Sequence, residues 1–258
     1  LVVNWMRVGF IHGVMNTDNM SIHGLTIDYG PYGWLEDYNL DWTPNTTDAS
    51  MRRYRYGQQP QIGAWNLAKF FESMIPLMDE PNLLHEALDA YTNIFKNLQN
   101  DMWVAKLGLD GFKVSDESLI EELNELLQVV ETDMTIFFRL LCSIEIPHID
   151  ILIGAFYDSS TIPTEQWNAW LSKWWSRVGE SPNRSKMRNA NPKYVLRNWM
   201  AQLAIDAAEI GDVSVCEELY LVLKNPYDEQ PEHEEKWFQR RPEWARKRVG
   251  CSMLSCSS

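Results

Sequence analysis

The fold is decided by residues 9–31, which read GFIHGVMNTDNMSIHGLTIDYGP. Asp18 and Asn19 stand side by side in a polar turn, and Asp28 follows behind the alternating segment 21–27. Apolar residues on either side of a Thr predict a short, partly buried strand there, which would return Asp28 towards the turn. Two carboxylates and one amide carbonyl would then converge. Such hard oxygen ligands suit Mg²⁺ or Mn²⁺ held together with phosphate oxygens.

The same stretch keeps the spacing of the protein-kinase catalytic loop. Kinases use H-R-D-x-x-x-x-N for a base and a metal ligand, and then D-F-G for a second ligand. Here His12 begins the first motif, Asn19 ends it, and Asp28-Tyr29-Gly30 stands in place of the second. Val14 occupies the position of the kinase base and cannot accept a proton. Metal ligands without that base indicate a kinase-like fold that has either lost phosphotransfer or changed its reaction. His12 is expected to support the loop backbone rather than to take part in catalysis.

Longer motifs carry a more specific resemblance. They are HGVMNTDNMSI at 12–22, LTIDYGP at 25–31, Gln59-Pro60, Trp65-Asn66-Leu67, NPKYVLRN at 191–198, PYDE at 226–229 and the ending Cys256-Ser257-Ser258. Together they resemble the selenoprotein O (SelO, YdiU) family, in register over nearly the whole chain. Members of that family are kinase-fold proteins that transfer AMP, rather than phosphate, from ATP to protein hydroxyls.

The resemblance implies roles for particular residues. Asp18 is expected to accept the proton of the substrate hydroxyl, and Asn19 and Asp28 to bind Mg²⁺ (or Mn²⁺), with Asp28 also facing ATP. Cys256 occupies the position where some family members carry selenocysteine, so a redox role and a frayed tail are the two interpretations there. Some bacterial relatives have a second cysteine that would align near Pro44. This chain lacks it, so no intramolecular disulfide switch is expected.

The implied fold is mainly α, with a protein-kinase-like C-lobe, short β segments around the metal site and a helical C-terminal extension. Residues 1–60 would hold the catalytic loop, the metal-binding motif and the activation segment. Residues 61–150 would form the helical core of the C-lobe, and 151–258 the extension and a redox-type tail, all as one packed unit. Neither a Gly-rich phosphate loop nor a Lys–Glu pair precedes the metal turn, and Leu1 is not an initiator. The N-lobe is therefore expected to be missing, and the isolated fragment to be inactive without it.

Composition sets outer bounds on the function. With 258 residues, 45% hydrophobic content and 12 Trp, the chain can bury the core of one large globular domain or two modest ones. No apolar run approaches the roughly 20 residues that span a membrane. The net charge of −13 argues against non-specific binding to nucleic acid or anionic membranes, because phosphate partners require clustered Lys and Arg. The bacterial cytoplasm and the mitochondrion both fit. Secretion does not, since a glycan at the Asn19 sequon would destroy the metal site.

Helical periodicity dominates the chain after residue 61. Apolar stripes predict helices over residues 67–78, 84–102, 119–130, 134–141, 167–175, 192–207 and 212–224. The Trp-rich stripe of 167–175 is expected in the core rather than as a ligand-stacking platform. Arg197 is expected to brace the lobe. Cys142 and Cys216 are expected in the core, and Cys251 in an exposed tail.

Residues 31–60 are irregular and would form the activation segment. Arg52, Arg53 and Arg55 alternate there with tyrosines, and they would contact phosphate or an acidic substrate, or else form a solvated basic patch. Both interpretations stay open at this point.

Three functions compete. The leading one is a Mg²⁺-dependent protein adenylyltransferase, in which a Ser, Thr or Tyr hydroxyl attacks the α-phosphorus of ATP and Asp18 takes the proton. A protein kinase that uses Asp18 as a displaced base would transfer a phosphoryl group instead. A catalytically inactive pseudokinase would be a binding module, and the presence of Asp18, Asn19 and Asp28 together counts against it.

Overall fold

The structure, a computed structural model, describes residues 1–77, 82–251 and 254. The chain is mainly helical, as expected, and the strands among these residues form one short antiparallel pair. Within the same residues no helix combines the length and the apolar character needed to cross a membrane. Cys256, the predicted redox position, lies outside the described residues.

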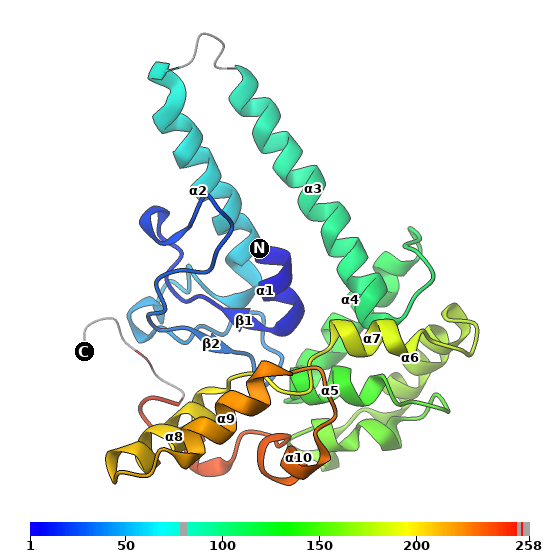
Figure 1. Cartoon of the computed structure of the whole chain (residues 1–258). Coiled ribbons are helices and arrows are strands. Elements are labelled where there is room, and N and C mark those ends of the chain that lie inside the picture. Colours follow the sequence, from blue (N-terminus) through cyan, green and yellow to red (C-terminus); the bar gives the residue numbers. More distant parts are fainter. Residues whose placement is uncertain (78–81, 252–253, 255–258) are drawn as a thin grey trace.

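Figure 1 shows the elements in chain order. The first are α1 (Val2–Val8), β1 (Phe10–Ile11), β2 (Gly33–Trp34), α2 (Gln59–Met74) and α3 (Asn82–Leu107). The central ones are α4 (Asp116–Val129), α5 (Met134–Leu141), α6 (Thr164–Arg177) and α7 (Arg184–Ala190). The last are α8 (Asn198–Glu209), α9 (Ser214–Lys224) and α10 (Pro231–Trp237).

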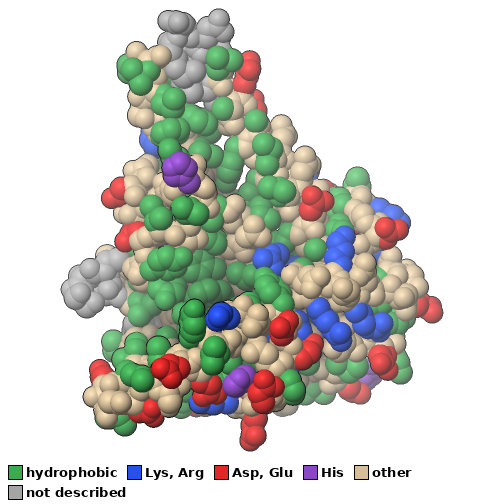
Figure 2. All heavy atoms as spheres, in the orientation of Figure 1, with side chains coloured by type: hydrophobic (Ala, Val, Ile, Leu, Met, Phe, Trp, Pro, Cys, Tyr) green, Lys and Arg blue, Asp and Glu red, His purple; other side chains and the backbone are tan. Residues whose placement is uncertain are grey.

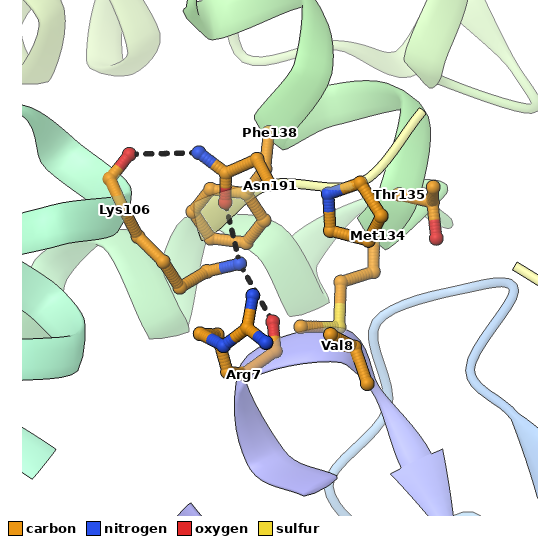
Figure 3. Close-up of a pocket in the computed structure, with 8 residues that line it drawn as sticks. Arg7, Val8, Lys106, Met134, Thr135, Phe138 and Asn191 are labelled. Carbon is orange, nitrogen blue, oxygen red and sulfur yellow. Dashed lines mark hydrogen bonds between the residues drawn. The ribbon is translucent and has the colours of Figure 1, made fainter. Parts of the chain in front are cut away.

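The end of α1 leads directly into the predicted catalytic loop. Gly9 ends the helix in the left-handed region, at φ 74°, and its N–H returns to the carbonyls of the last turn. β1 then pairs with β2, with Phe10 opposite Trp34. A buried lysine holds the same helix end from the other side, since Lys106 Nζ donates to the carbonyl of Arg7 at 2.9 Å and to Asn191 Oδ1 at 2.8 Å (Figure 3). Burial lowers the pKa of Lys106.

Helices α2 and α3 form a long hairpin that projects from the body of the molecule (Figure 1). The predicted apolar stripe of α3 is buried only at its base, where Met102 is 7% exposed, whereas Leu98 one turn earlier is 48% exposed. Of the stripe predicted for α2, Met78 lies outside the described residues, and Ile75 is exposed. Helical periodicity therefore identified both helices, but not the point at which each leaves the core.

The core lies among α4, α5 and α6, and the tryptophan stripe is part of it. Trp167, Trp170 and Trp174 are each at most 1% exposed, so the prediction of a core position is confirmed. Two indoles also bond backbone carbonyls of neighbouring helices: Trp170 Nε1 donates to Leu119 O at 2.8 Å, and Trp174 Nε1 to Leu107 O at 2.9 Å. These bonds join α6 to α4 and to the end of α3.

The segment before α8 differs from the prediction. Residues 192–197 are irregular, and α8 begins at Asn198 rather than at Pro192. The backbone N–H groups of Lys193 and Tyr194 both donate to the carbonyl of Pro226, at 2.8 and 3.1 Å, which keeps them out of a helix. The helix prediction was wrong here because a distant segment supplied the hydrogen-bond acceptor.

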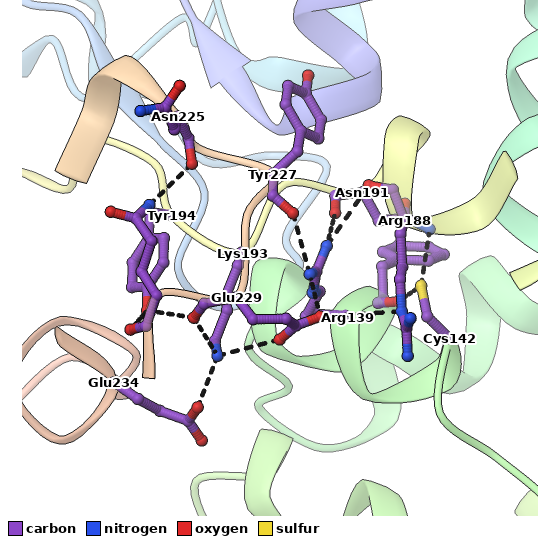
Figure 4. Close-up of polar contacts among 12 residues, drawn as sticks. Arg139, Cys142, Arg188, Asn191, Lys193, Tyr194, Asn225, Tyr227, Glu229 and Glu234 are labelled. Atoms are coloured by element: carbon purple, nitrogen blue, oxygen red, sulfur yellow. Dashed lines mark hydrogen bonds and ion pairs between the residues drawn. The ribbon is translucent and has the colours of Figure 1, made fainter. Parts of the chain in front are cut away.

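A polar cluster fastens the C-terminal helices to the core (Figure 4). Arg139 of α5 donates to the carbonyls of Asn191 and Tyr227, at 3.1 and 3.0 Å, and pairs with Glu229. Lys193 Nζ donates to the Glu229 carbonyl at 2.7 Å. Both cations are buried, so the cluster is structural rather than a solvated surface.

The division of the chain at residues 60 and 150 stays a prediction.

Two cysteines lie where they were not expected. Cys142 is buried as predicted, but Cys216 is exposed on α9, because it falls on the solvent face of that helix. Cys251 is 5% exposed and packs in the cluster formed by α8, α9 and α10. The prediction of an exposed tail was therefore wrong at Cys251, where the chain turns back onto these helices.

Candidate functional site

The turn that carries the predicted catalytic residues is a single 3₁₀ turn, Thr17–Asn19. Asp18 is exposed at its centre, and Asn19 is half-buried. The Asn19 amide donates from Nδ2 to the carbonyl of Val14 at 3.1 Å. This bond orients the side chain and leaves its Oδ1 as the atom for a cation.

His12 ties this turn to the segment that precedes Asp28. The ring is buried, its Nε2 lies 2.8 Å from the carbonyl of Ile27, and its Nδ1 accepts the N–H of Val14 at 3.4 Å. Since a carbonyl only accepts, Nε2 carries the proton and the imidazole is neutral when both bonds are made. The expected structural role of His12 is thus confirmed.

Asp28 lies beyond a narrow hairpin. An isolated antiparallel bridge joins Met20 to Thr26, and Asp28 itself has a left-handed backbone, at φ 56°. The chain therefore does fold back after the turn, as the alternating pattern predicted. The predicted face was wrong, because Leu25 and Ile27 are 61% and 37% exposed.

The side chains of Leu25 and Ile27 point outward because of a hydrogen bond between α1 and the hairpin. Thr26, between the two exposed apolar residues, accepts the indole N–H of Trp5 at 3.0 Å. The Thr hydroxyl therefore takes the inner position, and its apolar neighbours point outward. The hairpin presents an apolar rim beside Asp28 instead of adding to the core.

Three buried side-chain amides hold the loop from outside, and sequence reasoning assigned them no role. Gln59 accepts the N–H of His12 at 3.0 Å and donates to the carbonyl of Phe10 at 2.9 Å. Asn66 donates to the carbonyl of Met15 at 2.9 Å, and Asn45 to that of Gly13 at 3.1 Å. The loop has almost no ladder of its own, so these amides satisfy backbone groups that would otherwise be buried unpaired. No local pattern marked Gln59 and Asn66, because the same helix also carries the polar residues Gln61, Lys69, Glu72 and Ser73.

The donor set can be tested for its fit to a divalent cation. Asp18 and Asp28 are exposed carboxylates, and Asn19 offers one oriented amide oxygen. Among the described residues no group of three or more His, Cys, Asp or Glu side chains is placed to hold a metal. Asp18, Asn19 and Asp28 offer oxygen atoms of the kind that Mg²⁺ takes from proteins, and binding of Mg²⁺ by these residues stays a prediction.

The activation segment is fastened by the C-terminal part of the chain. Leu254 forms a parallel bridge with Asn45, its carbonyl accepts the N–H of Thr46 at 2.8 Å, and its N–H donates to the carbonyl of Pro44 at 3.1 Å. Asn45 also bonds the catalytic loop at Gly13. Asn45 thus links the loop, the predicted activation segment and the C-terminal segment.

A buried ionic network lies under the start of the activation segment. Arg241 lies 3.0 Å from both Glu36 and Glu131 and 3.4 Å from Asp37. Its Nε is close enough to Glu36 for an ion pair but is not aligned for a hydrogen bond. Beside it, Arg197 forms a fully buried pair with Asp133 at the start of α5, which confirms its bracing role. Desolvation raises the pKa of Glu36 to about 7, with Arg197 and Arg241 opposing the shift.

With this geometry established, comparison with known proteins identifies the family. A model of the family described as Protein adenylyltransferase SelO matches residues 1–224. The chain belongs to the SelO family. The helical fold, the hairpin and its carboxylates are therefore those of a SelO-family chain, as the motifs in the sequence predicted.

Relatives that carry the name Protein nucleotidyltransferase YdiU align with the whole of this SelO-family chain. The protein of Flavobacterium johnsoniae is 49% identical over 271 residues, that of Aromatoleum aromaticum 49% over 267, and that of Rhodopirellula baltica 49% over 282. Each alignment covers 100% of this chain but only 51–52% of the relative. The chain thus spans about half the length of the curated relatives it matches.

Proposed function

We propose that this chain carries the catalytic loop and activation segment of a Mg²⁺-dependent protein adenylyltransferase, which moves AMP from ATP to Ser, Thr or Tyr hydroxyls of proteins. The observation that supports this most is the set of bonds around His12. They join the turn of Asp18 and Asn19 to the residue before Asp28, while Val14 fills the position of the kinase base. Family membership and the names of the relatives support nucleotidyl transfer in general.

Each residue of the loop would have its own role in the reaction. The exposed carboxylate of Asp18 is free to take the proton of an incoming hydroxyl. The hydroxyl oxygen forms a bond to the α-phosphorus, the bond from that phosphorus to the β-phosphate oxygen breaks, and pyrophosphate leaves. Asn19 and Asp28 would hold Mg²⁺, which when bound neutralises charge that develops on the phosphates. His12 keeps the two metal-binding positions at a fixed separation.

We further propose that the chain is the C-lobe of a kinase-like fold and needs an N-lobe for activity. The support is an apolar face beside the hairpin. Two cavities of about 380 and 270 Å³ adjoin there and share Val8, Trp34 and Tyr227. Figure 2 shows hydrophobic side chains gathered on this side of the molecule, between α2 and the α8–α9 pair. An exposed apolar surface of this extent is typical of an interface.

The test restores a complete enzyme. The N-terminal half of a relative that is 49% identical, such as that of Flavobacterium johnsoniae, is fused to this chain and incubated with ATP and Mg²⁺. Intact mass and peptide spectra then report which group reaches the protein. An adenylyl adduct that is lost in Asp28→Ala and in Asp18→Asn, but kept in the control Asp150→Asn at an exposed carboxylate outside the loop, supports the proposal.

Other outcomes separate the alternatives. A phosphoryl adduct would make the protein a kinase that uses Asp18 as a displaced base. ATP binding without any adduct on a panel of protein substrates would favour the pseudokinase. The isolated chain is expected to give no adduct, and activity of the isolated chain would contradict the need for an N-lobe.

A further inference from the structure

The three arginines of the activation segment differ in their partners. Arg55 is half-buried, and its Nε lies 3.0 Å from Asp41 Oδ1, so its charge is compensated within the chain. Arg52 and Arg53 are exposed, and neither makes an ion pair with a carboxylate among the described residues. The two interpretations of this group therefore apply to different members: Arg55 is structural, and Arg52 and Arg53 are free to bind.

Arg53 lies on an aromatic surface. Its guanidinium carbon is 4.5 Å from the centre of the Trp65 ring and 5.7 Å from that of Tyr54. Trp65 is itself 41% exposed. A guanidinium held flat against an aromatic face still presents its N–H edge to solvent, and that edge matches a carboxylate with two parallel hydrogen bonds.

The backbone beneath these side chains is held in place. Asp48 is buried, and its carboxylate accepts the N–H of Arg53 at 2.8 Å and that of Tyr54 at 2.7 Å. Arg52 has a left-handed backbone, at φ 47°. The loop is therefore preorganised, so ligand binding has to order only the ends of the two arginine side chains.

This surface adjoins the catalytic turn on two sides. The hydroxyl of Tyr54 donates to Asn16, the residue directly before the turn that carries Asp18. Trp65 precedes Asn66, which holds the carbonyl of Met15. A peptide that places a hydroxyl near Asp18 would thus pass over the arginines with its flanking residues.

We propose that Arg53 on Trp65, with Arg52 beside it, binds acidic side chains that flank the acceptor hydroxyl of a protein substrate. This inference rests on the proposed adenylyl transfer and adds a substrate class to it. The net charge of −13 would repel acidic substrates in general, so two guanidiniums without carboxylate partners beside the acceptor position give local selectivity. Aspartate and glutamate side chains are the groups that fit the N–H edges.

A binding experiment on the chain itself tests the inference without any transfer. A fluorescein-labelled peptide with one Ser among Asp and Glu residues is titrated at low salt and without nucleotide, and compared with the same peptide bearing Asn and Gln. We expect the acidic peptide to bind at least tenfold more tightly, with an affinity that falls as salt rises. Arg52→Gln with Arg53→Gln should weaken it about tenfold, and Arg53→Lys should weaken it less than Arg53→Gln. Lys96→Gln, which removes one exposed cation from α3, should have no effect.

Several outcomes would overturn the inference. Equal binding of the two peptides, or an unaltered affinity in the double variant, would remove the arginines from substrate recognition. Displacement of the peptide by ATP alone would make the surface a phosphate site instead.

The fused enzyme distinguishes this inference from the function on which it rests. If adenylyl transfer occurs but does not favour the acidic peptide, the substrate class is wrong and the proposed function stands. If the chain binds the acidic peptide but the fused enzyme transfers no adenylyl group to it, the proposed function fails instead. In the double variant, we expect the ratio of transfer to the acidic peptide over the neutral one to fall towards one.

Discussion

At the scale of single residues, the segment from Val14 to Asp28 depends on His12. Its ring bonds the backbone at Ile27, just after the Met20–Thr26 bridge, and at Val14, before the turn that carries Asp18, and neither the carbonyl of Ile27 nor the N–H of Val14 gains another partner from the neighbouring side chains described here. Position rather than acid–base chemistry gives this histidine its importance. Gly13 likewise matters for its backbone conformation and its lack of a side chain, and not for any chemistry.

His12→Ala is therefore expected to lower the free energy of unfolding by about 3 kcal/mol, because it removes a buried ring and leaves the carbonyl of Ile27 unpaired. Urea titration measures the loss. His23→Ala is the matched control, since His23 is exposed in the same hairpin, and it should change stability by less than about 0.5 kcal/mol. Equal effects of the two substitutions would show that His12 does not hold the hairpin together.

Gly13→Ala tests the closest backbone approach in the loop. Gly13 has φ 79°, and a Cβ there would lie 2.2 Å from the carbonyl oxygen of Pro31. The left-handed backbone and the clash together should cost about 3 kcal/mol. Gly24→Ala separates the two causes, because Gly24 has φ 68° but an open space around it, and should cost only about 1 kcal/mol. A thermal or urea midpoint that falls equally in both variants would exclude the contact with Pro31.

At the scale of elements, α2 holds the predicted catalytic loop in place through side-chain hydrogen bonds. β1 has only two residues, so the side chain of Gln59, the first residue of α2, supplies hydrogen bonds to the backbone of Phe10 and His12 that a longer strand would have made. Asn66, seven positions later on the same side of α2, bonds the backbone at Met15. Two turns of a helix place both amides over the loop. No described residue in the exposed outer half of the α2–α3 hairpin makes a comparable contact with it.

Gln59→Met should therefore destabilise the loop more than the fold of α2. The substitution keeps the volume but leaves the N–H of His12 and the carbonyl of Phe10 buried and unpaired, at a cost of about 2–4 kcal/mol. Hydrogen exchange should speed up most in residues 10–19. Gln61→Met, at an exposed position two residues further along α2, is the control. Exchange that rises uniformly over the chain would assign Gln59 a general role in packing.

At the scale of the whole molecule, the C-terminal segment and the activation segment are parts of one ionic and backbone network. Arg241 bridges Glu36 and Asp37 to Glu131, and Leu254 pairs with Asn45. The family match ends at residue 224, so these contacts join the matched region to the part of the chain that follows it. The network contains more carboxylates than cations at its buried centre, and desolvation raises the pKa of both Glu36 and Asp37.

The direction in which the free energy of unfolding changes with pH depends on which state, folded or unfolded, binds more protons. The folded protein retains the proton of Glu36 up to a pKa of about 7, whereas the unfolded chain loses it near the ordinary glutamate pKa of 4.5. Between these values the folded state binds more protons, so the free energy of unfolding should fall as pH rises, by about 3 kcal/mol over the interval. Asp37 contributes in the same direction.

Urea unfolding at pH 5.0 and 7.5 measures this slope, and Glu36→Gln should flatten most of it. Glu117→Gln removes an exposed glutamate of α4 and should leave the slope unaltered. Stability that rises over this interval in the unmodified chain would mean that Glu36 is charged and well paired in the folded state.

Much of this molecule follows from local pattern. The spacing of Asp18, Asn19 and Asp28 predicts a catalytic stretch, which stays a prediction, and apolar periodicity placed most of the helices, including the tryptophan stripe in the core. Such features depend on residues within one or two turns of each other, whose geometry the backbone alone dictates. The family, too, was evident from the motifs and was confirmed by comparison.

Other features were decided only when distant segments met. The outward face of Leu25 depends on Trp5, the irregular backbone at Lys193 depends on Pro226, and the burial of Cys251 depends on the helices onto which it folds. In each case a partner far along the chain supplied the hydrogen bond or the apolar contact, and no local pattern records which partner that will be. Local pattern in the sequence therefore placed most of the helices and predicted the candidate catalytic residues, whereas tertiary structure decided which faces are buried and what holds the loop, because those depend on contacts between remote parts of the chain.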